Sequence, residues 1–235
     1  MLLFLGDSST IGVELEIELS EPMPKDYNLS TVYNQGLPFP KIPPFRADLA
    51  YPQLIANALD QPFWNLGIQA ASYDVILSNF QKFIKLYEVP TDTTVFLSSV
   101  SFFRRTMIDS FDNKIYRFFP YPLDNPPQIC YDAEELLMRT APRHAVQQIN
   151  HIYEICKSRN WTFVFHGVGH RYSEEELDAI NKICDIPQEH RLSRLYQDKN
   201  WQAEQKDLWF GCHPSVKGHE QIANELIAHY KEQIV

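Results

Sequence analysis

The sequence predicts an α/β protein, a three-layer α/β/α sandwich whose central sheet has five mostly parallel strands. Short apolar segments alternate along the chain with longer segments in which apolar residues recur at helical spacing. Strands and helices that alternate in this way build a parallel sheet with helices on both faces. Glycine or polar residues directly follow several of the apolar segments, at the sheet edge where such folds bind ligands.

Five short segments are predicted to be strands because they are apolar or rich in β-branched and aromatic residues. They are 2–5, 63–67, 93–99, 161–166 and a segment within 183–187. The stretch 14–19 also alternates apolar and acidic residues with the period of a strand, although a helix should follow the first strand of such a fold. This stretch is left unassigned.

Helices are predicted between the strands from capping residues and apolar positions at helical spacing. Asp48 should cap a helix over 48–59 that tolerates Pro52 in its first turn, and Ser72 should cap a helix over 73–87. Asp132 should cap a helix that Pro142 breaks or kinks, with a second helical stretch running on to residue 159. The remaining predicted helices are 174–183 and 215–230.

The 235 residues are expected to form one domain, 1–235, with insertions at about 20–47 and 102–131. The first insertion holds six prolines, and the second is rich in Phe, Tyr, Pro and Arg. Neither has a clear period, and we expect both to wall the ligand-binding edge of the sheet.

Composition excludes several classes of function. An apolar fraction of 44% belongs to a packed globule, and a net charge of −9 argues against a nucleic-acid partner. The four cysteines contain no CxxC pair, and glycines place His166 and His170 in a loop, so no metal site is expected. No apolar stretch approaches the roughly 20 residues of a membrane span. A strand that begins at Met1 leaves no room for a signal peptide, so the predicted location is cytoplasmic, without a membrane partner.

The first apolar segment ends in Gly6-Asp7-Ser8-Ser9, which places the Ser8 hydroxyl on a tight turn leaving the sheet. Such a turn also aims backbone N–H groups at the pocket, and acyl transfer needs both a nucleophile and donors for the oxyanion. Ser8 is therefore the candidate nucleophile, and Asp7 is expected to hold the turn by accepting N–H groups. The alternative is an ordinary turn, since Gly, Asp and Ser all form turns.

The matching base stands near the other end, in the segment 212–219, Cys-His-Pro-Ser-Val-Lys-Gly-His. His213 is the candidate general base, because a hydroxyl at neutral pH needs an imidazole to take its proton. The alternative is a plain helix start, for which Pro214 and Ser215 are suitable residues. His219 is expected to be a packing or surface residue.

These two blocks resemble the first and last motif blocks of the SGNH (GDSL-type) hydrolase family. The resemblance implies a flavodoxin-like fold and serine hydrolase chemistry without a cofactor, with Ser8 as nucleophile and His213 as base. The chain would be a divergent member. The family usually carries Asp three residues before this His, where this chain has Phe210, and the nearest upstream acid is Asp207. Either Asp207 completes a triad, or His213 works in a dyad oriented by a backbone carbonyl.

The oxyanion hole implied by the resemblance also departs from the family pattern. The second-block glycine falls on Ala70, whose N–H can still donate. The third block, which normally supplies an Asn amide, contains no Asn here. Ser99 or Ser101 could offer a hydroxyl in its place, and Arg104 or Arg105 a cation. Loss of one such donor typically costs about 10²–10³ in rate.

The sequence as a whole predicts a serine esterase acting on a small acyl ester, with acetyl as a candidate acyl group. The substrate is expected to be a small-molecule or glycan ester, and no oligomeric state is predicted. The second interpretation is a catalytically impaired binding or structural module of the same fold, such as a virion or surface assembly component. The missing Asn and the displaced acid motivate it, and an unusually reactive Ser8 would exclude it.

Overall fold

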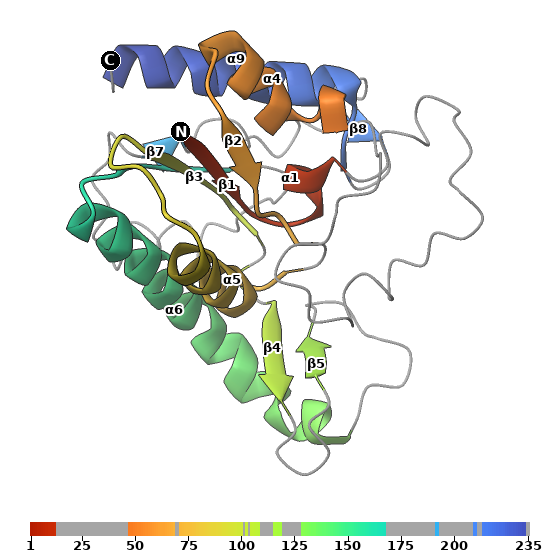
Figure 1. Ribbon diagram of the computed structural model, residues 1–235. Helices are drawn as coiled ribbons and strands as arrows, with labels where there is room; N and C mark the ends of the chain where they lie inside the picture. Colours follow the sequence, from red (N-terminus) through yellow and green to blue (C-terminus); the bar gives the residue numbers. More distant parts are fainter. Residues whose placement is uncertain are drawn as a thin grey trace.

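The computed structural model describes residues 1–12, 47–68, 71–100, 102, 104–108, 115–118, 128–167, 191–192, 209–210 and 213–233. Its centre is a five-stranded sheet. The strands are β1 (Leu2–Leu5), β2 (Phe63–Asn65), β3 (Thr94–Ser98), β6 (Thr162–His166) and β7 (Arg191–Leu192). They lie in the order β2-β1-β3-β6-β7, and every ladder is parallel (Figure 1). The predicted fold class is confirmed.

Helices cover both faces of this sheet. The helices α4 (Tyr51–Leu59) and α9 (Val216–Gln233) pack together on one face, and α5 (Tyr73–Leu86) and α6 (Gln128–Ser158) pack together on the other (Figure 1). The strand order changes direction at β1, with β2 on one side and β3 on the other. In an open parallel sheet, ligands bind beyond the carboxyl ends of the strands at such a point.

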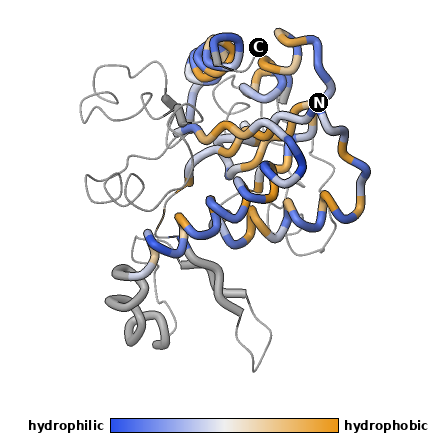
Figure 2. The backbone as a smooth tube through the Cα atoms, turned by 90° about the vertical axis from the view of Figure 1, so that its left-hand side faces the viewer, coloured by the Kyte–Doolittle hydropathy of each residue, from blue (hydrophilic) through white to orange (hydrophobic). Residues whose placement is uncertain are grey.

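The first strand is buried on both faces, which explains why it reads as a continuous apolar run. Leu2 and Phe4 face α4 and α9, whereas Leu3 and Leu5 face α5 and α6. Leu2, Leu3 and Phe4 have no exposed surface, and Phe4 stacks on Phe96 of β3 with ring centroids 5.0 Å apart. Hydrophobic residues accordingly dominate the central strands, and the helices carry a mixture of polar and apolar residues (Figure 2).

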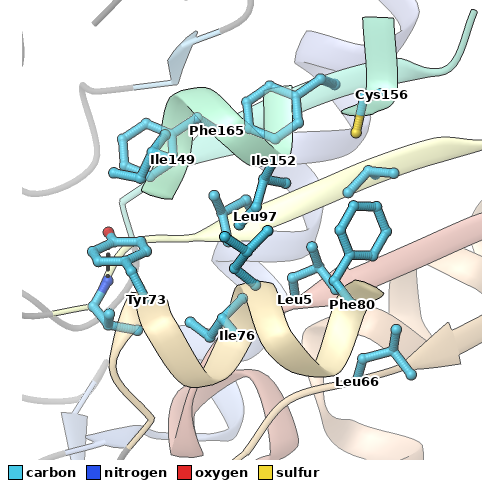
Figure 3. Packing of buried hydrophobic residues seen from close by; sticks show 14 of the residues in the cluster. Leu5, Leu66, Tyr73, Ile76, Phe80, Leu97, Ile149, Ile152, Cys156 and Phe165 are labelled. Carbon is cyan, nitrogen blue, oxygen red and sulfur yellow. Dashed lines mark hydrogen bonds between the residues drawn. The ribbon is translucent and has the colours of Figure 1, made fainter. Parts of the chain in front are cut away.

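The larger of the two core clusters lies between the sheet and the pair α5 and α6. Leu5 and Leu97 extend from the strands toward Ile76 and Phe80 of α5 and Ile152 of α6 (Figure 3). This cluster anchors the carboxyl end of β1, from which the candidate nucleophile follows directly in sequence.

Three helix boundaries differ from the sequence predictions. Asp48 lies in a short 3-10 helix, η1 (Ala47–Leu49), and α4 has Ala50 as its N-cap, so Asp48 is not the cap of α4. Helix α6 begins at Gln128, directly after two prolines in the sequence, so Asp132 is not its cap either. Pro142 lies inside α6 without ending it, because the neighbouring Ala145 and other buried residues of the helix pack into the core cluster. Ser72 occupies the N-cap position of α5, as predicted, but its side chain makes no capping hydrogen bond to the helix.

Two antiparallel hairpins were not predicted. One is β4 (Arg105–Ile108) with β5 (Ile115–Phe118), inside the expected second insertion. The other is β8 (Trp209–Phe210) with β9 (His213–Pro214). The unassigned stretch 14–19 and the predicted segments 174–183 and 183–187 lie outside the described residues, as does nearly all of the insertion at 20–47. No helix in the described part of the chain has the length and apolar character needed to cross a bilayer.

Candidate active site

The candidate nucleophile begins a helix of one turn. Ser8 is the first residue of α1 (Ser8–Ile11), which leaves the carboxyl end of β1. Asp7 is the N-cap, and its Oδ1 accepts the backbone N–H of Ser9 at 3.1 Å, so its expected role in holding the turn is observed. Gly12 ends the helix with a φ of 87°, which favours glycine. The exposed fraction of Ser8 is 5%.

The turn into α1 can be made only by a glycine at position 6. A Cβ atom there would lie 2.1 Å from Thr10 Oγ1 and 2.7 Å from Ser98 Cβ. The close approach brings the first turn of α1 over the end of β3. The structure therefore explains two residues of the Gly-Asp-Ser turn. Position 6 has no room for a Cβ atom, and Asp7 caps the helix.

A cation from the third block lies on the same turn. Arg104 Nη1 donates to Asp7 Oδ2 at 2.5 Å, with the Arg104 side chain 23% exposed and that of Asp7 8% exposed. The ion pair fixes Arg104 one residue away from Ser8. Charge-assisted hydrogen bonds to partly buried carboxylates are among the stronger ones in proteins.

The first and last sequence blocks meet in the structure. Helix α1, which starts at Ser8, contacts β9, which contains His213. His213 pairs with Phe210 across the hairpin, so the position of the usual family Asp is directly opposite the candidate base. Ser215 is buried, and its Oγ accepts the Gly218 N–H at 3.1 Å at the start of α9.

A buried polar cluster lies on the α4 and α9 face, next to α1. The Tyr51 hydroxyl donates to Thr10 Oγ1 at 3.0 Å, and the Tyr51 N–H donates to His219 Nδ1 at 3.1 Å. The His219 ring stacks on Tyr51 at 5.8 Å, so His219 is a packing residue. His166, at the end of β6, meets the Tyr51 ring edge-on at 5.5 Å.

Burial controls the protonation of this cluster. It raises the pKa of Tyr51 far above its ordinary value, with a smaller opposing effect from the Thr10 hydrogen bond, so the phenol stays neutral. Burial also lowers the pKa of His166, and His229 adds a smaller lowering because two nearby imidazolium charges repel, so that the pKa is about 3. Neither ring nitrogen of His166 has a hydrogen-bond partner within the described residues.

Asn65 was not singled out from the sequence. Its side-chain Nδ2 donates to the Thr10 carbonyl at 2.8 Å, and its Oδ1 accepts the Gly67 N–H at 3.0 Å. A Cβ at Gly67 would lie 3.0 Å from Ile11 Cγ1 and 3.2 Å from the Asp7 carbonyl, so this loop lies directly against α1. The only sequence signal was that Asn65, in the predicted second strand, stands two positions before Gly67.

Of the remaining predicted site residues, the structure describes Ser99. Ser99 is buried at the end of β3, where its N–H donates to the His166 carbonyl at 2.7 Å. Ala70, Ser101 and Asp207 lie outside the described residues. Across the described ranges, no three His, Cys, Asp or Glu side chains are grouped to hold a metal ion.

No protein-family model matches the sequence, and no curated protein matches it. Solved esterase structures share its fold. Est2A, an acetyl xylan esterase from the rumen bacterium Butyrivibrio proteoclasticus, aligns with a TM-score of 0.54 and 16% identity, over 99% of this chain and 64% of its own. The psychrotrophic esterase EstA from Pseudoalteromonas sp., inhibited by monoethylphosphonate, aligns with a TM-score of 0.52 and 13% identity, over 98% of this chain and 96% of its own.

A carbohydrate esterase, whose active site is described as having divergent catalytic and non-catalytic binding functions, aligns with a TM-score of 0.53 and 13% identity. That alignment covers 99% of this chain and 68% of the esterase. The chain therefore has the α/β fold of these esterases. At such identities the likeness shows the fold alone, and the activity has to be argued from the site.

Proposed function

We propose that the chain is a divergent SGNH-type serine esterase, a single domain with insertions at about 20–47 and 102–131. The observation that carries this proposal is the contact between α1 and β9, because it joins the elements of Ser8 and His213 at one edge of the sheet. These residues are 205 positions apart in the sequence. Serine acyl transfer requires an imidazole within hydrogen-bond reach of the serine, and a serine at the start of α1 beside the strand that carries His213 supports such a pairing.

In the proposed reaction, Ser8 Oγ attacks the ester carbonyl while His213 takes its proton. His213 then returns the proton to the departing alcohol, and an acyl-serine ester remains. Water attacks this ester, again with His213 as base, and Ser8 is restored as the acid leaves. The N–H groups of Ser8 and Ala70 stabilise the oxyanion. Asp207 orients the imidazole in the triad form of the proposal.

The third block is proposed to complete the site. Ser99 and Ser101 stand where the family places its Asn donor, and the Arg104 cation lies beside the turn that bears Ser8. In this proposal either Ser99 or Ser101 supplies the hydroxyl donor, and Arg104 supplies the cation that contacts the substrate or its oxyanion. The reaction as written consumes only water and needs no cofactor.

The substrate we propose is a small acyl ester, with an acetyl ester on a carbohydrate as the favoured class. Ser8 is only 5% exposed, and a nucleophile with so little accessible surface admits a short acyl group more easily than a long one. Two of the structural neighbours are named as a carbohydrate esterase and an acetyl xylan esterase, which supports the choice of alcohol.

The second candidate is a binding or structural module that has kept the fold with an impaired site. The pairing of Phe210 with His213 favours it, because an apolar residue stands where the family places the orienting carboxylate. An orienting carboxylate can be worth about 10⁴ in turnover, so its loss would leave a weak enzyme.

Labelling with a fluorophosphonate separates the two candidates. The reagent forms a bond from Ser8 Oγ to phosphorus, expels fluoride, and needs the same proton transfer to the base as the ester reaction. Stoichiometric labelling of the wild type, lost in Ser8→Ala and kept in the exposed Ser78→Ala control, is the expected result. No labelling of folded wild-type protein would support the binding module. Asp207→Asn should slow labelling in a triad and leave it unchanged in a dyad.

A further inference from the structure

The Asn65 side chain joins two segments that flank the candidate nucleophile. Its Nδ2 donates to the Thr10 carbonyl of α1 at 2.8 Å, and its Oδ1 accepts the Gly67 N–H of the β2–α5 loop at 3.0 Å. The partners fix the orientation of the amide, because a carbonyl can only accept and a backbone N–H can only donate. Both ends of the amide are therefore used in one geometry.

The loop beside Asn65 is itself held along the end of β1. The Leu66 N–H donates to the Phe4 carbonyl at 2.8 Å, and the Ile68 N–H donates to the Gly6 carbonyl at 3.0 Å. The loop is thus a fixed extension of the sheet, and Asn65 ties α1 to it. Gly67 allows the contact because it carries no Cβ to collide with Ile11.

Helix α1 is only four residues long, so its direction depends on contacts outside the helix as well as on its own backbone bonds. It contains one turn, in which the Asp7 carbonyl accepts the Thr10 and Ile11 N–H groups and the Ser8 carbonyl accepts the Gly12 N–H. A tilt of this turn moves Ser8 and Thr10 together. The bond from Asn65 to the Thr10 carbonyl resists such a tilt at the end of the turn opposite the Asp7 cap.

We propose that Asn65 is a positioning residue for acyl transfer, which holds the helix of Ser8 against the β2–α5 loop in the geometry the reaction needs. The inference rests on the proposed esterase function, since it concerns the same nucleophile. A displacement of about 1 Å at a reacting atom can cost about 10²-fold in rate. Asn65 therefore acts on the rate of Ser8 modification without touching the substrate.

The isosteric change Asn65→Asp gives a test in which lowering the pH should restore the hydrogen bond that the substitution removes. At pH 8 the ionised carboxylate still accepts the Gly67 N–H but cannot donate to the Thr10 carbonyl, and its charge opposes that carbonyl. When the new carboxyl group is protonated, it regains a donor and an acceptor. The matched control is Asn57→Asp, the same chemical change on the exposed face of α4, where Asn57 Oδ1 accepts from Gln53.

The measured quantity is the rate of fluorophosphonate modification of Ser8 between pH 8 and pH 5, as a ratio of variant to wild type. We expect Asn65→Asp to label about 10²-fold more slowly at pH 8 and its ratio to rise as the pH falls, while the ratio for Asn57→Asp stays near one. Circular dichroism at each pH shows that the variants are folded. A ratio near one at pH 8, or a lowered ratio that does not change with pH, would overturn the proposal.

A second comparison covers the case in which Asn65→Asp is unfolded at pH 8. At pH 5 the protonated fraction of Asn65→Asp should make this variant label faster than Asn65→Ala, which has neither donor nor acceptor at this position. Equal rates for the two variants would overturn the positioning role. If wild-type Ser8 is not labelled at all, the esterase proposal itself fails, and this outcome is distinct from a labelled wild type with an equally fast Asn65→Asp.

Discussion

Replacing His166 by leucine is expected to remove part of the acid sensitivity of the fold. His166 is fully buried at the end of β6, where its ring lies nearly perpendicular to the Tyr51 ring. The His219 ring stacks on Tyr51, and His229 is near enough to affect the pKa of His166. Its pKa in the folded chain is about 3, compared with an ordinary value of 6.5. Below pH 6.5 the unfolded chain therefore binds a proton at this residue that the folded chain does not bind.

The sign and size of the effect follow from proton linkage. The free energy of unfolding falls as the pH is lowered through the window between 6.5 and about 3, because protons stabilise the unfolded chain there. Each pH unit well inside this window costs up to about 1.4 kcal/mol, so the loss from this one group between pH 7.5 and pH 5 is about 2 kcal/mol. Leucine has a similar volume and no titrating group.

The assay is urea unfolding of the wild type and His166→Leu at pH 7.5, 6 and 5. At pH 7.5 the two should agree within about 1.5 kcal/mol, since neither ring nitrogen of His166 has a partner among the described residues for leucine to lose. At pH 5 the variant should have lost about 2 kcal/mol less than the wild type. His151→Gln, which removes an exposed imidazole from α6, is the control. An acid loss in His166→Leu as large as in the wild type would refute the reasoning.

Three further variants test the turn that bears the nucleophile. Gly6→Ala should destabilise the fold by about 3 kcal/mol or more, because its Cβ would lie 2.1 Å from Thr10 Oγ1; a urea midpoint within error of the wild type would contradict this. Tyr51→Phe deletes the 3.0 Å hydrogen bond to Thr10 and should lower the free energy of unfolding by about 1 kcal/mol, measured by the same method. An unchanged stability would show that this hydrogen bond does not stabilise the turn. Arg104→Gln leaves the Asp7 carboxylate without its cation and should slow labelling of the nucleophile by about tenfold. Arg104→Lys should recover part of the rate. Equal rates in the wild type and both variants would show that the ion pair does not support the site.

The sheet was predictable from the sequence because its strands are buried on both faces. Strands β1, β3 and β6 appear as short, continuous apolar runs, and such runs need no knowledge of their neighbours to be recognised. The two-residue strand β7 and the hairpin β8–β9 are different. Each of these strands is only two residues long, which is too short to show an alternation of apolar and polar residues. They are strands because their backbone pairs with another strand, β7 with β6 and β8 with β9. Likewise Pro142 signals a helix end locally, but packing against the core keeps α6 continuous.

The candidate site was predictable at its two ends and not between them. Ser8 and His213 stand out because a Gly-Asp-Ser turn after a strand and a His-Pro-Ser helix start are local patterns. Asn65 could not be singled out, since its role depends on the Thr10 carbonyl, 55 positions away. The bond between the Tyr51 N–H and His219 spans 168 positions and has no local signal at all.

The central claim is that Ser8 and His213 act together, and the most direct test is the rate of fluorophosphonate labelling in His213→Ala. Loss of the base should slow modification of Ser8 by at least about 10²-fold in a protein that remains folded. His151→Ala, which removes an exposed imidazole, should label like the wild type. If His213→Ala instead labels Ser8 at the wild-type rate, the contact between α1 and β9 does not form a catalytic pair, and the account is wrong.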